Sequence, residues 1–584
     1  MADLTHQLQI QARFGARSRA LVVDGHATAR TMLASQLRGL GLGQVLQCAS
    51  AHDARQHMAT LGVDVLLVEY RLDNDILGQT LIDDLRRDGL LPLRTVVVML
   101  SSQASYQVVA QVAESALDGF VIKPYTPGKL EDRLISAFQR KDALRAVYDA
   151  IEADQHAQAL MQCEKRYAQR GPYWTHAARI GAELAIRLEQ LPLASAMYAA
   201  VLADKAVPWA KLGLARVLQA DGQADAAVST ICDLLDKEPK YADAYDVMGR
   251  IHAERGDLAG AITAYRQAVE ITPFSVARAQ KYGILAWYAA GPDVALPALE
   301  HAARIGCDSP QFDHQTLLLL AMARFQHGDA AGLRQCHQQL EGVLGRQTRA
   351  QAGGQGGAPA GGQQPGVARI DRLRRLGQMS QALVAVQAQD RPLLQACLVP
   401  VGDELLAPGF DVEAATNLLS LIATSAAAGL APQQADHWTR SAGLRFCVSK
   451  QVTEMLARAC DPAPSLGLLV RAAHAEINEI SRNALSEGLA GRHQLAVETL
   501  LRAVERTRNA KLLELAQAAL ERHRAHIAAA EALAERCSVL QSLCSTVGRS
   551  HLLSHDNGRA PGGTGLPAAR GKPGRRAAPA PAET

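Results

Sequence analysis

The sequence predicts an α/β doubly wound domain followed by an all-α superhelix. Over the first 140 residues, short apolar runs alternate with helical patterns, which is typical of a parallel sheet covered by helices on both faces. After residue 140, apolar residues recur at helical spacing only. Only 4% of the 584 residues are aromatic, and this favours helices packed through Ala and Leu over a β-sandwich.

Five apolar runs mark the expected strands of the first domain. They cover residues 20–24, 44–48, 63–68, 95–100 and 120–122. The helical patterns between and after them include 28–40, 78–87, 106–115 and 127–140. Because ligands of such sheets bind outside the carboxyl ends of the strands, we expect the polar side chains at these ends to form a site. Those side chains are Asp24, Glu69, Ser101 and Lys123.

Two acids, a hydroxyl and a lysine at four strand ends resemble the pocket of a bacterial response regulator receiver domain. The segments VVD, LLVEYRL and DGFVIKPYTP extend this resemblance over residues 18–140. It implies a flavodoxin-like fold whose relatives are phosphorylated, with Mg²⁺, on an aspartate after the third strand. Carried onto this chain, it implies the phosphoacceptor position at Glu69, the other pocket positions at Asp24, Ser101 and Lys123, and the aromatic that reorients on activation at Phe120.

Two positions depart from the receiver pattern. Gly25 stands where a second acid helps to hold Mg²⁺, and Glu69 stands where the phosphoacceptor aspartate is expected. A nucleophile displaced by an extra methylene is poorly aligned for phosphoryl transfer. We therefore expect a pseudo-receiver without a cofactor, with Mg²⁺ at Asp24 and Glu69 only if the pocket is functional. Two interpretations of Glu69 stay open: it imitates the phosphorylated state by reaching Lys123, or it forms an inert ion pair.

The helical part contains a repeat of about 34 residues. Residues 242–275 resemble a tetratricopeptide repeat (TPR), with the signature positions Tyr245, Gly249, Ala261, Tyr265, Ala268 and Pro273. The small residues let two helices approach closely, and Pro273 ends the second helix. The preceding unit repeats the pattern with Trp209 and Gly213. Single repeats cannot bury their faces, so we expect stacked repeats with a groove for a partner protein.

Inside that groove, we expect one repeat to present a short set of positions from its first helix. These positions are Asp243, Asp246, Val247 and Arg250. They are either specificity residues for a partner or ordinary solvated positions.

The same patterns predict the division of the chain. We expect an N-terminal extension at 1–17, a receiver-like domain at 18–140, TPR helices at 141–345, a Gly-, Gln- and Pro-rich linker at 346–368, a TPR-like helical region at 369–552 and a disordered basic tail at 553–584.

Composition excludes several classes of function. The chain carries 61 Lys and Arg against 58 Asp and Glu, which argues against a strongly basic nucleic-acid surface. None of the ten cysteines forms a CxxC pair, and no P-loop, GxSxG or HExxH motif is present. The N-terminus lacks the apolar region of a signal peptide, and the longest uncharged stretch, 414–435, is too polar for a membrane span. We expect a cytoplasmic protein without membrane or nucleic-acid partners.

Taken with the resemblance to response regulators that have a TPR output, these observations predict a non-enzymatic adaptor in a two-component-type pathway. Its partner is expected to be a protein in the TPR groove, and a histidine kinase or another response regulator is a further candidate. Two alternatives stay open. One is a phosphorylatable response regulator with a protein-binding output, and the other is a transcription regulator that binds DNA through a segment such as 445–457.

Overall fold

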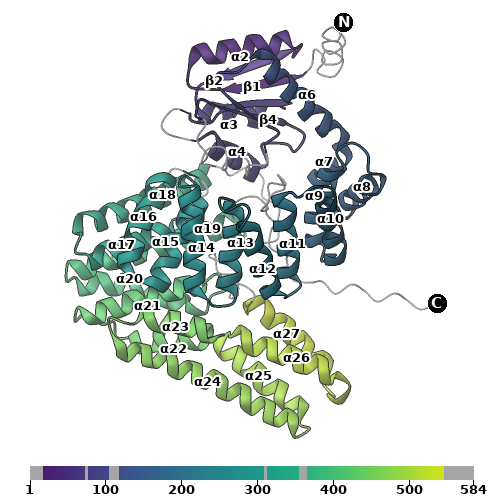
Figure 1. The fold of residues 1–584 in the computed structure, drawn as a ribbon. Coiled ribbons are helices and arrows are strands. Elements are labelled where there is room, and N and C mark those ends of the chain that lie inside the picture. Colours follow the sequence, from purple (N-terminus) through teal and green to yellow (C-terminus); the bar gives the residue numbers. More distant parts are fainter. Residues whose placement is uncertain are drawn as a thin grey trace.

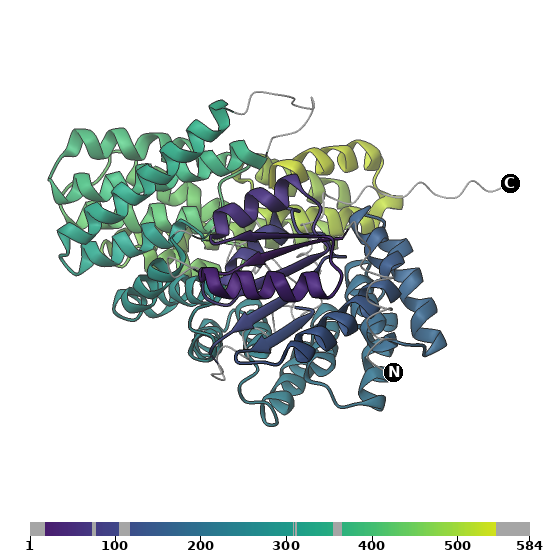
Figure 2. The same ribbon diagram turned by 90° about the horizontal axis from the view of Figure 1, so that it is seen from above.

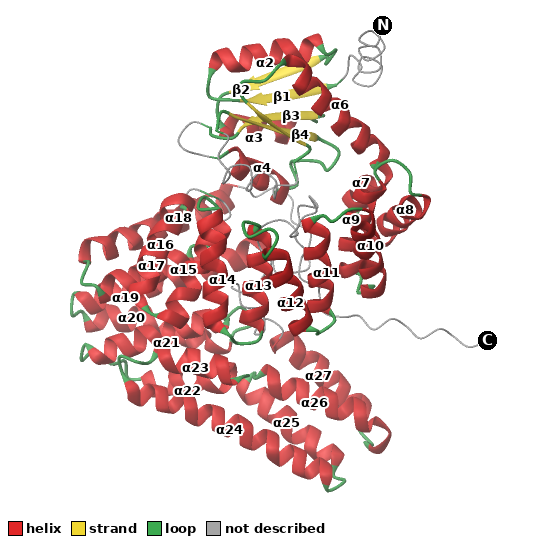
Figure 3. Ribbon diagram, in the orientation of Figure 1, coloured by secondary structure: helices red, strands yellow, loops and turns green. Residues whose placement is uncertain are grey.

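The computed structural model describes residues 18–72, 77–103, 117–307, 309, 312–353 and 365–544. The predicted N-terminal extension, the helix expected at 106–115 and the predicted basic tail lie outside the described residues. Strands occur in the N-terminal domain, and the rest of the described chain is helical (Figure 3). Within these ranges, no helix combines the length and the apolar character that crossing a bilayer requires.

The N-terminal domain is built on a parallel sheet. Its strands are β1 (Arg19–Val23), β2 (Gln44–Cys48), β3 (Val65–Glu69), β4 (Val96–Ser101) and β5 (Gly119–Ile122). They pair in the order β2-β1-β3-β4-β5, with every pair parallel. All residues of the central strands β3 and β4 are buried. The chain order reverses between β1 and β3, which places the ligand-binding edge of this sheet where those two strands end.

Helices cover both faces of the sheet. These helices are α2 (Ala27–Gly39), α3 (Ala51–Thr60), α4 (Gly78–Arg87) and α6 (Pro127–Ala143). Leu66 and Val68 share one apolar core with residues of α3 and α4, whereas Leu67 shares the other with residues of α2 and α6. This alternation follows from the two-residue period of a strand. The α/β doubly wound, flavodoxin-like fold predicted for this domain is confirmed.

Helical repeats follow α6. The first run of helices comprises α7 (Arg145–Glu152), α8 (His156–Gln169), α9 (Trp174–Arg187), α10 (Leu191–Asp204), α11 (Pro208–Ala220), α12 (Ala224–Leu235), α13 (Ala242–Glu254), α14 (Leu258–Ile271), α15 (Val276–Ala290), α16 (Pro292–Gly306), α17 (Gln315–Gln326) and α18 (Ala330–Gly353). The second run comprises α19 (Pro365–Gln387), α20 (Arg391–Asp403), α21 (Val412–Ala427), α22 (Ala435–Phe446), α23 (Lys450–Ala459), α24 (Pro464–Leu489), α25 (His493–Thr507), α26 (Ala510–His523) and α27 (Ala530–Cys544).

The helices wind into a superhelix that lies below the α/β domain in Figure 1. The view from above in Figure 2 places that domain over the middle of the helical part. The predicted all-α superhelix is therefore confirmed. It follows the doubly wound domain directly, since α6 and α7 are separated only by Leu144.

The TPR signature residues pack the helices closely. A Cβ added to Gly249 of α13 would lie 2.8 Å from the ring of Tyr265 in α14, which is only 2% exposed. Ala261 and Ala268 of the same helix are fully buried. Gly213 of α11 differs, because a Cβ there would overlap the ring of Tyr198 in the preceding helix α10. The same small residue type thus tightens packing within a repeat or between repeats.

The remaining signature residues lie at the ends of the repeats. Trp209, at the start of α11, makes an edge contact with Tyr198, with ring centroids 6.3 Å apart. The hydroxyl of Tyr245 donates to the carbonyl of Pro239 at 3.2 Å. Pro273 follows α14 directly after Thr272, and its carbonyl oxygen lies 2.7 Å from His301 Nε2 of α16.

The C-terminal helices continue the first superhelix. Helix α18 extends to Gly353 and α19 begins at Pro365, so both helices reach further into the segment 346–368 than its composition predicts. Residues 354–364 between them lie outside the described part. One apolar core runs from Ala261 through Leu383 to Val470. Packing of α18 against α19 outweighs the weak helix propensity of Gly-rich sequence.

Replacing Gly213 by Ala is expected to lower the free energy of unfolding by about 1–3 kcal/mol, because the added methyl group collides with the buried ring of Tyr198. Urea denaturation followed by circular dichroism measures this change. Gly342→Ala in α18 is the matched control, since the nearest atom to its new Cβ is Arg346 Nη1 at 3.6 Å. There stability should hold or rise by up to about 1 kcal/mol. Equal effects at the two glycines would contradict the packing argument.

Candidate functional site

The carboxyl edge of the sheet carries the residues predicted to form the pocket. Asp24 directly follows β1 and is fully buried, and Glu69 is the last residue of β3 and only 7% exposed. Lys123 directly follows β5. The parallel register aligns these strand ends, so the three side chains meet although they are far apart in the sequence.

Lys123 bridges the two acids. Its Nζ donates to Asp24 Oδ2 at 3.0 Å and to Glu69 Oε2. The side chain of Lys123 is 24% exposed, whereas those of Asp24 and Glu69 are 0% and 9% exposed. The ammonium group therefore neutralises part of the charge of two carboxylates that are shielded from water.

The pKa values in the pocket follow from burial and from this bridge. Burial raises the pKa of Glu69 above its ordinary value, and the hydrogen bond from Lys123 opposes this rise without cancelling it. Burial alone would lower the pKa of Lys123, but hydrogen bonds and charges from Glu69 and Asp24 outweigh it and raise that pKa. Lys123 consequently stays positively charged at neutral pH.

The other oxygen of Asp24 is also occupied. The backbone N–H of His26 donates to Asp24 Oδ1 at 2.9 Å. Arg30, on the first turn of α2, donates from Nη1 to the carbonyls of Asp24 at 2.5 Å and Gly25 at 2.8 Å. Arg30 was not among the residues predicted for the pocket, although an arginine one turn into the helix that follows the first strand is a signal that could have located it.

The structure does not bring Ser101 and Phe120 into this bridge. The Ser101 hydroxyl donates to the carbonyl of Gln103 at 3.1 Å and accepts from its N–H at 3.0 Å, so it is held by its own loop. Phe120 is half-buried and packs against the apolar core on one face of the sheet. Tyr125 was not predicted as a site residue. Its hydroxyl is buried and has no hydrogen-bond partner among the described residues, and burial raises its pKa.

The donor set around Asp24 and Glu69 does not fit Mg²⁺. Lys123 takes one oxygen of each carboxylate, the His26 N–H takes another, and Gly25 supplies no side chain. Mg²⁺ requires nearly octahedral oxygen coordination. In the part of the chain that the structure describes, no cluster of three His, Cys, Asp or Glu residues is arranged to hold a metal ion.

The predicted groove positions of the 242–275 repeat are not free. Asp243 and Asp246 accept hydrogen bonds from Arg278 of α15 at 2.9 and 2.8 Å, and Arg278 is only 1% exposed. Val247 is 2% exposed. Arg278 of the next repeat therefore pairs with the two acids, and Val247 packs in the core shared with α11 and α12 of the preceding repeat, so these three positions are not freely solvated.

The receiver-like domain contacts the first repeat through α6. Lys141 Nζ donates to the carbonyl of Leu93 at 2.5 Å, and Arg140 binds Asp118 Oδ1 at 2.5 Å. The other carboxylate oxygen of Asp118 accepts from the N–H of Val97 in β4 at 2.9 Å. Glu152 of α7 accepts from the N–H of Leu93 at 2.5 Å. The first repeat is thereby tied to the sheet at the ends opposite the pocket.

Replacing Lys123 by Ala is expected to destabilise the receiver-like domain by about 3 kcal/mol near pH 7.5, because two buried carboxylates lose their cation. The loss should shrink near pH 5. Since the pKa of Glu69 is raised, this carboxyl takes up a proton as the pH falls and the unpaired charge disappears. Urea unfolding at both pH values measures the effect.

Lys129→Ala is the control for this prediction, because Lys129 is exposed at the start of α6. It should change the free energy of unfolding by less than about 0.5 kcal/mol. A Lys123 variant as stable as this control at pH 7.5 would show that the bridge does not contribute to stability.

Comparison with known proteins agrees with this geometry. The model of the response regulator receiver domain matches residues 20–135, and that of a tetratricopeptide repeat-like domain matches residues 135–279. The chemotaxis protein CheY-3 of Vibrio cholerae is 22% identical over 131 residues, which are 22% of this chain and 99% of that protein. The chemotaxis protein CheY of Pseudomonas aeruginosa is 24% identical over 122 residues, which are 21% of this chain and 97% of its own.

Among solved structures, the C-terminal part of a TPR repeat-containing protein from Cytophaga hutchinsonii aligns with a TM-score of 0.33 at 15% identity, covering 44% of this chain and 92% of that one. The sheet order, the residues at its carboxyl edge and the two family matches lead to one conclusion. The chain contains a response regulator receiver domain at residues 20–135, followed by a tetratricopeptide repeat-like domain at residues 135–279.

Proposed function

We propose that this protein is a non-enzymatic signal-transduction adaptor whose receiver domain is not efficiently phosphorylated. A receiver followed by a TPR-like region supports a response regulator with a protein-binding output. The proposal adds that the receiver is a pseudo-receiver and that the repeats bind a partner protein. A histidine kinase or another response regulator is the candidate partner of the receiver surface.

The observation that carries the proposal is the bridge from Lys123 to Glu69 and Asp24. In the receivers that this domain resembles, the lysine pairs with the phosphoryl group. Here the carboxylate of Glu69 already provides an anion at the lysine. Phosphorylation would have to break this bridge. It would also add negative charge to a pocket in which Gly25 supplies no second acid to help hold the Mg²⁺ that would balance that charge.

The repeats support the protein-binding part of the proposal. Stacked TPR helices form continuous surfaces that bind peptide segments or helices. In the described part of the chain, no metal cluster accompanies these helices, and neither family match is typical of an enzyme. Binding of another protein is the activity that best fits this arrangement.

The contacts of Asp118, Arg140 and Lys141 support coupling between the two parts. Leu93 of the receiver packs against the same apolar core as Leu144 and Val147 of the first repeat. We propose that a change in the pocket reaches α7 and α8 through α6 and strand β4.

The phosphorylation proposal predicts the mass of the protein after incubation with acetyl phosphate and Mg²⁺. Wild type should stay unmodified in intact-mass spectrometry. The double variant Glu69→Asp with Gly25→Asp should gain about 80 Da, because it has the shorter acceptor and the missing acid. Glu69→Gln is the matched control and should gain nothing. A phosphoryl group on wild type would instead establish a phosphorylatable response regulator.

The coupling proposal predicts hydrogen exchange at a distance from the pocket. Lys123→Ala should speed amide exchange in residues 145–169, because the loosened strand ends transmit motion through α6. In a protein that already carries Asp118→Asn, adding Lys123→Ala should not speed this exchange further if Asp118 carries the coupling. Unchanged exchange in α7 and α8 of the Lys123 variant would contradict the proposal.

A further inference from the structure

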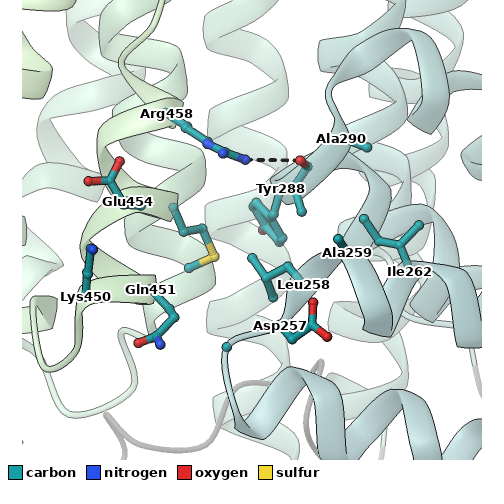
Figure 4. A pocket seen from close by; sticks show the side chains of 13 residues that line it. Asp257, Leu258, Ala259, Ile262, Tyr288, Ala290, Lys450, Gln451, Glu454 and Arg458 are labelled. Atoms are coloured by element: carbon teal, nitrogen blue, oxygen red, sulfur yellow. Dashed lines mark hydrogen bonds between the residues drawn. The ribbon is translucent and has the colours of Figure 1, made fainter.

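A cleft of about 690 Å³ lies where two distant parts of the superhelix meet. One wall is the turn between α13 and α14 together with the end of α15, and the other wall is α23 (Figure 4). The walls touch at Gly256, where an added Cβ would overlap the side chain of Gln451. Arg458 Nη1 also donates to the carbonyl of Ala289 at 3.1 Å. Because α23 lies far from α14 and α15 in the sequence, the cleft exists only in the folded superhelix.

The floor of the cleft is apolar. Leu258 and Ile262 of α14 line one side, and Met455 of α23 lines the other. Tyr288 lies at the base, and its hydroxyl is occupied, since it donates to Asn417 Oδ1 at 2.9 Å. The ring of Tyr288 is therefore available to the cleft mainly as an apolar surface. An apolar side chain of a ligand would lose water on three sides here.

The acids of the cleft are engaged within the protein. The carboxylate of Asp257 accepts from the N–H of Gly260 at 2.9 Å, which caps α14, and lies 2.8 Å from His252 Nδ1. Glu454 forms an ion pair with Arg471 of α24 at 3.2 Å. Their negative charges are thus balanced by a helix N-terminus and by an arginine outside the cleft.

The cations of the cleft have no such balance. Lys450 and Arg458 both lie on α23 and line the cleft. Among the ion pairs of the described residues, none involves either side chain, and the partner of Arg458 is a neutral carbonyl. The two positions are two helical turns apart, about 12 Å at 1.5 Å per residue. The wall formed by α23 therefore presents the positive charges of Lys450 and Arg458 at the two ends of an apolar floor, with the carboxylate of Glu454, which pairs with Arg471, between them (Figure 4).

We infer that this cleft binds an acidic linear segment of a partner protein, with an apolar side chain flanked by two carboxylates. An extended chain spans about 3.3 Å per residue, so acids separated by three or four residues match the two cations. The inference deepens the proposed function and rests on it, because it names the chemistry that the repeats recognise.

A second cavity supports a linear ligand over a small molecule. It has a volume of about 700 Å³ and shares Tyr288, Met455 and Arg458 with the first. Trp287 and Phe325 add aromatic surface to it. A peptide segment that passes over the hydrogen bond between Arg458 and the carbonyl of Ala289 would fill both cavities. Arg458 would then lie beside the backbone of the peptide.

The experiment selects, from a library of displayed random peptides, those that bind the full-length protein. Enriched peptides should contain two acids three or four residues apart with an aliphatic or aromatic residue between them. A synthetic peptide of that sequence should bind the Lys450→Glu, Arg458→Glu variant at least about tenfold more weakly than wild type in fluorescence anisotropy. Lys237→Glu with Arg334→Glu is the matched control, because it makes the same charge change at exposed positions that do not line the cleft.

The outcomes separate the inference from the proposed function. Enriched peptides that bind the cleft variant as tightly as wild type, or peptides without acids, overturn the inference and leave peptide binding by the repeats intact. No enrichment on the folded protein overturns both. Circular dichroism of the variants checks folding, and Met455→Ala provides a second variant that removes floor surface without changing charge.

Discussion

A pair of repeat helices cannot bury both its faces by itself, and this constraint governs most of the molecule. Each repeat is stable only against its neighbours, so Tyr198 fills the space left by Gly213, and Tyr265 fills that left by Gly249. The stacking of helices continues on both sides of the segment rich in Gly and Gln, because α18 packs on α19. At the start of the superhelix, the receiver covers the outer face of the first repeat, because Leu93 packs on the core of that repeat.

The receiver pocket is governed by charge rather than by packing. Two carboxylates at the ends of β1 and β3 are tolerated in a nearly dry pocket because one ammonium group neutralises part of their charge. The extra methylene of Glu69 is accommodated in an otherwise intact parallel sheet. The pocket therefore combines the fold of a phosphorylated switch with an anion that belongs to the protein itself. The proposed role as a non-phosphorylated docking module rests on this combination.

The superhelix also uses charge to close surfaces that a partner would otherwise occupy. Arg278 fills the space between Asp243 and Asp246, so this part of the predicted groove is a joint between repeats. The cleft at α23 is the opposite case: among the ion pairs of the described residues, Glu454 has a partner outside the cleft, whereas Lys450 and Arg458 have none. Paired charges such as those of Arg278 hold neighbouring repeats together, whereas the proposed binding of an acidic segment rests on the two cations of the cleft.

The sequence by itself determined the elements and the local relations between them. The strand ends at Asp24, Glu69 and Lys123 could be predicted because each apolar run ends at a polar residue, and the spacing from Gly249 to Tyr265 could be predicted because it lies within one repeat. It could not show that the Ser101 hydroxyl is held by its own loop, that Gly213 packs against the preceding helix, or that Asp243 is covered by Arg278. The contact of Gln451 with Gly256 was decided only by the tertiary structure. Its position is the sum of small rotations between successive repeats, and no local pattern encodes that sum.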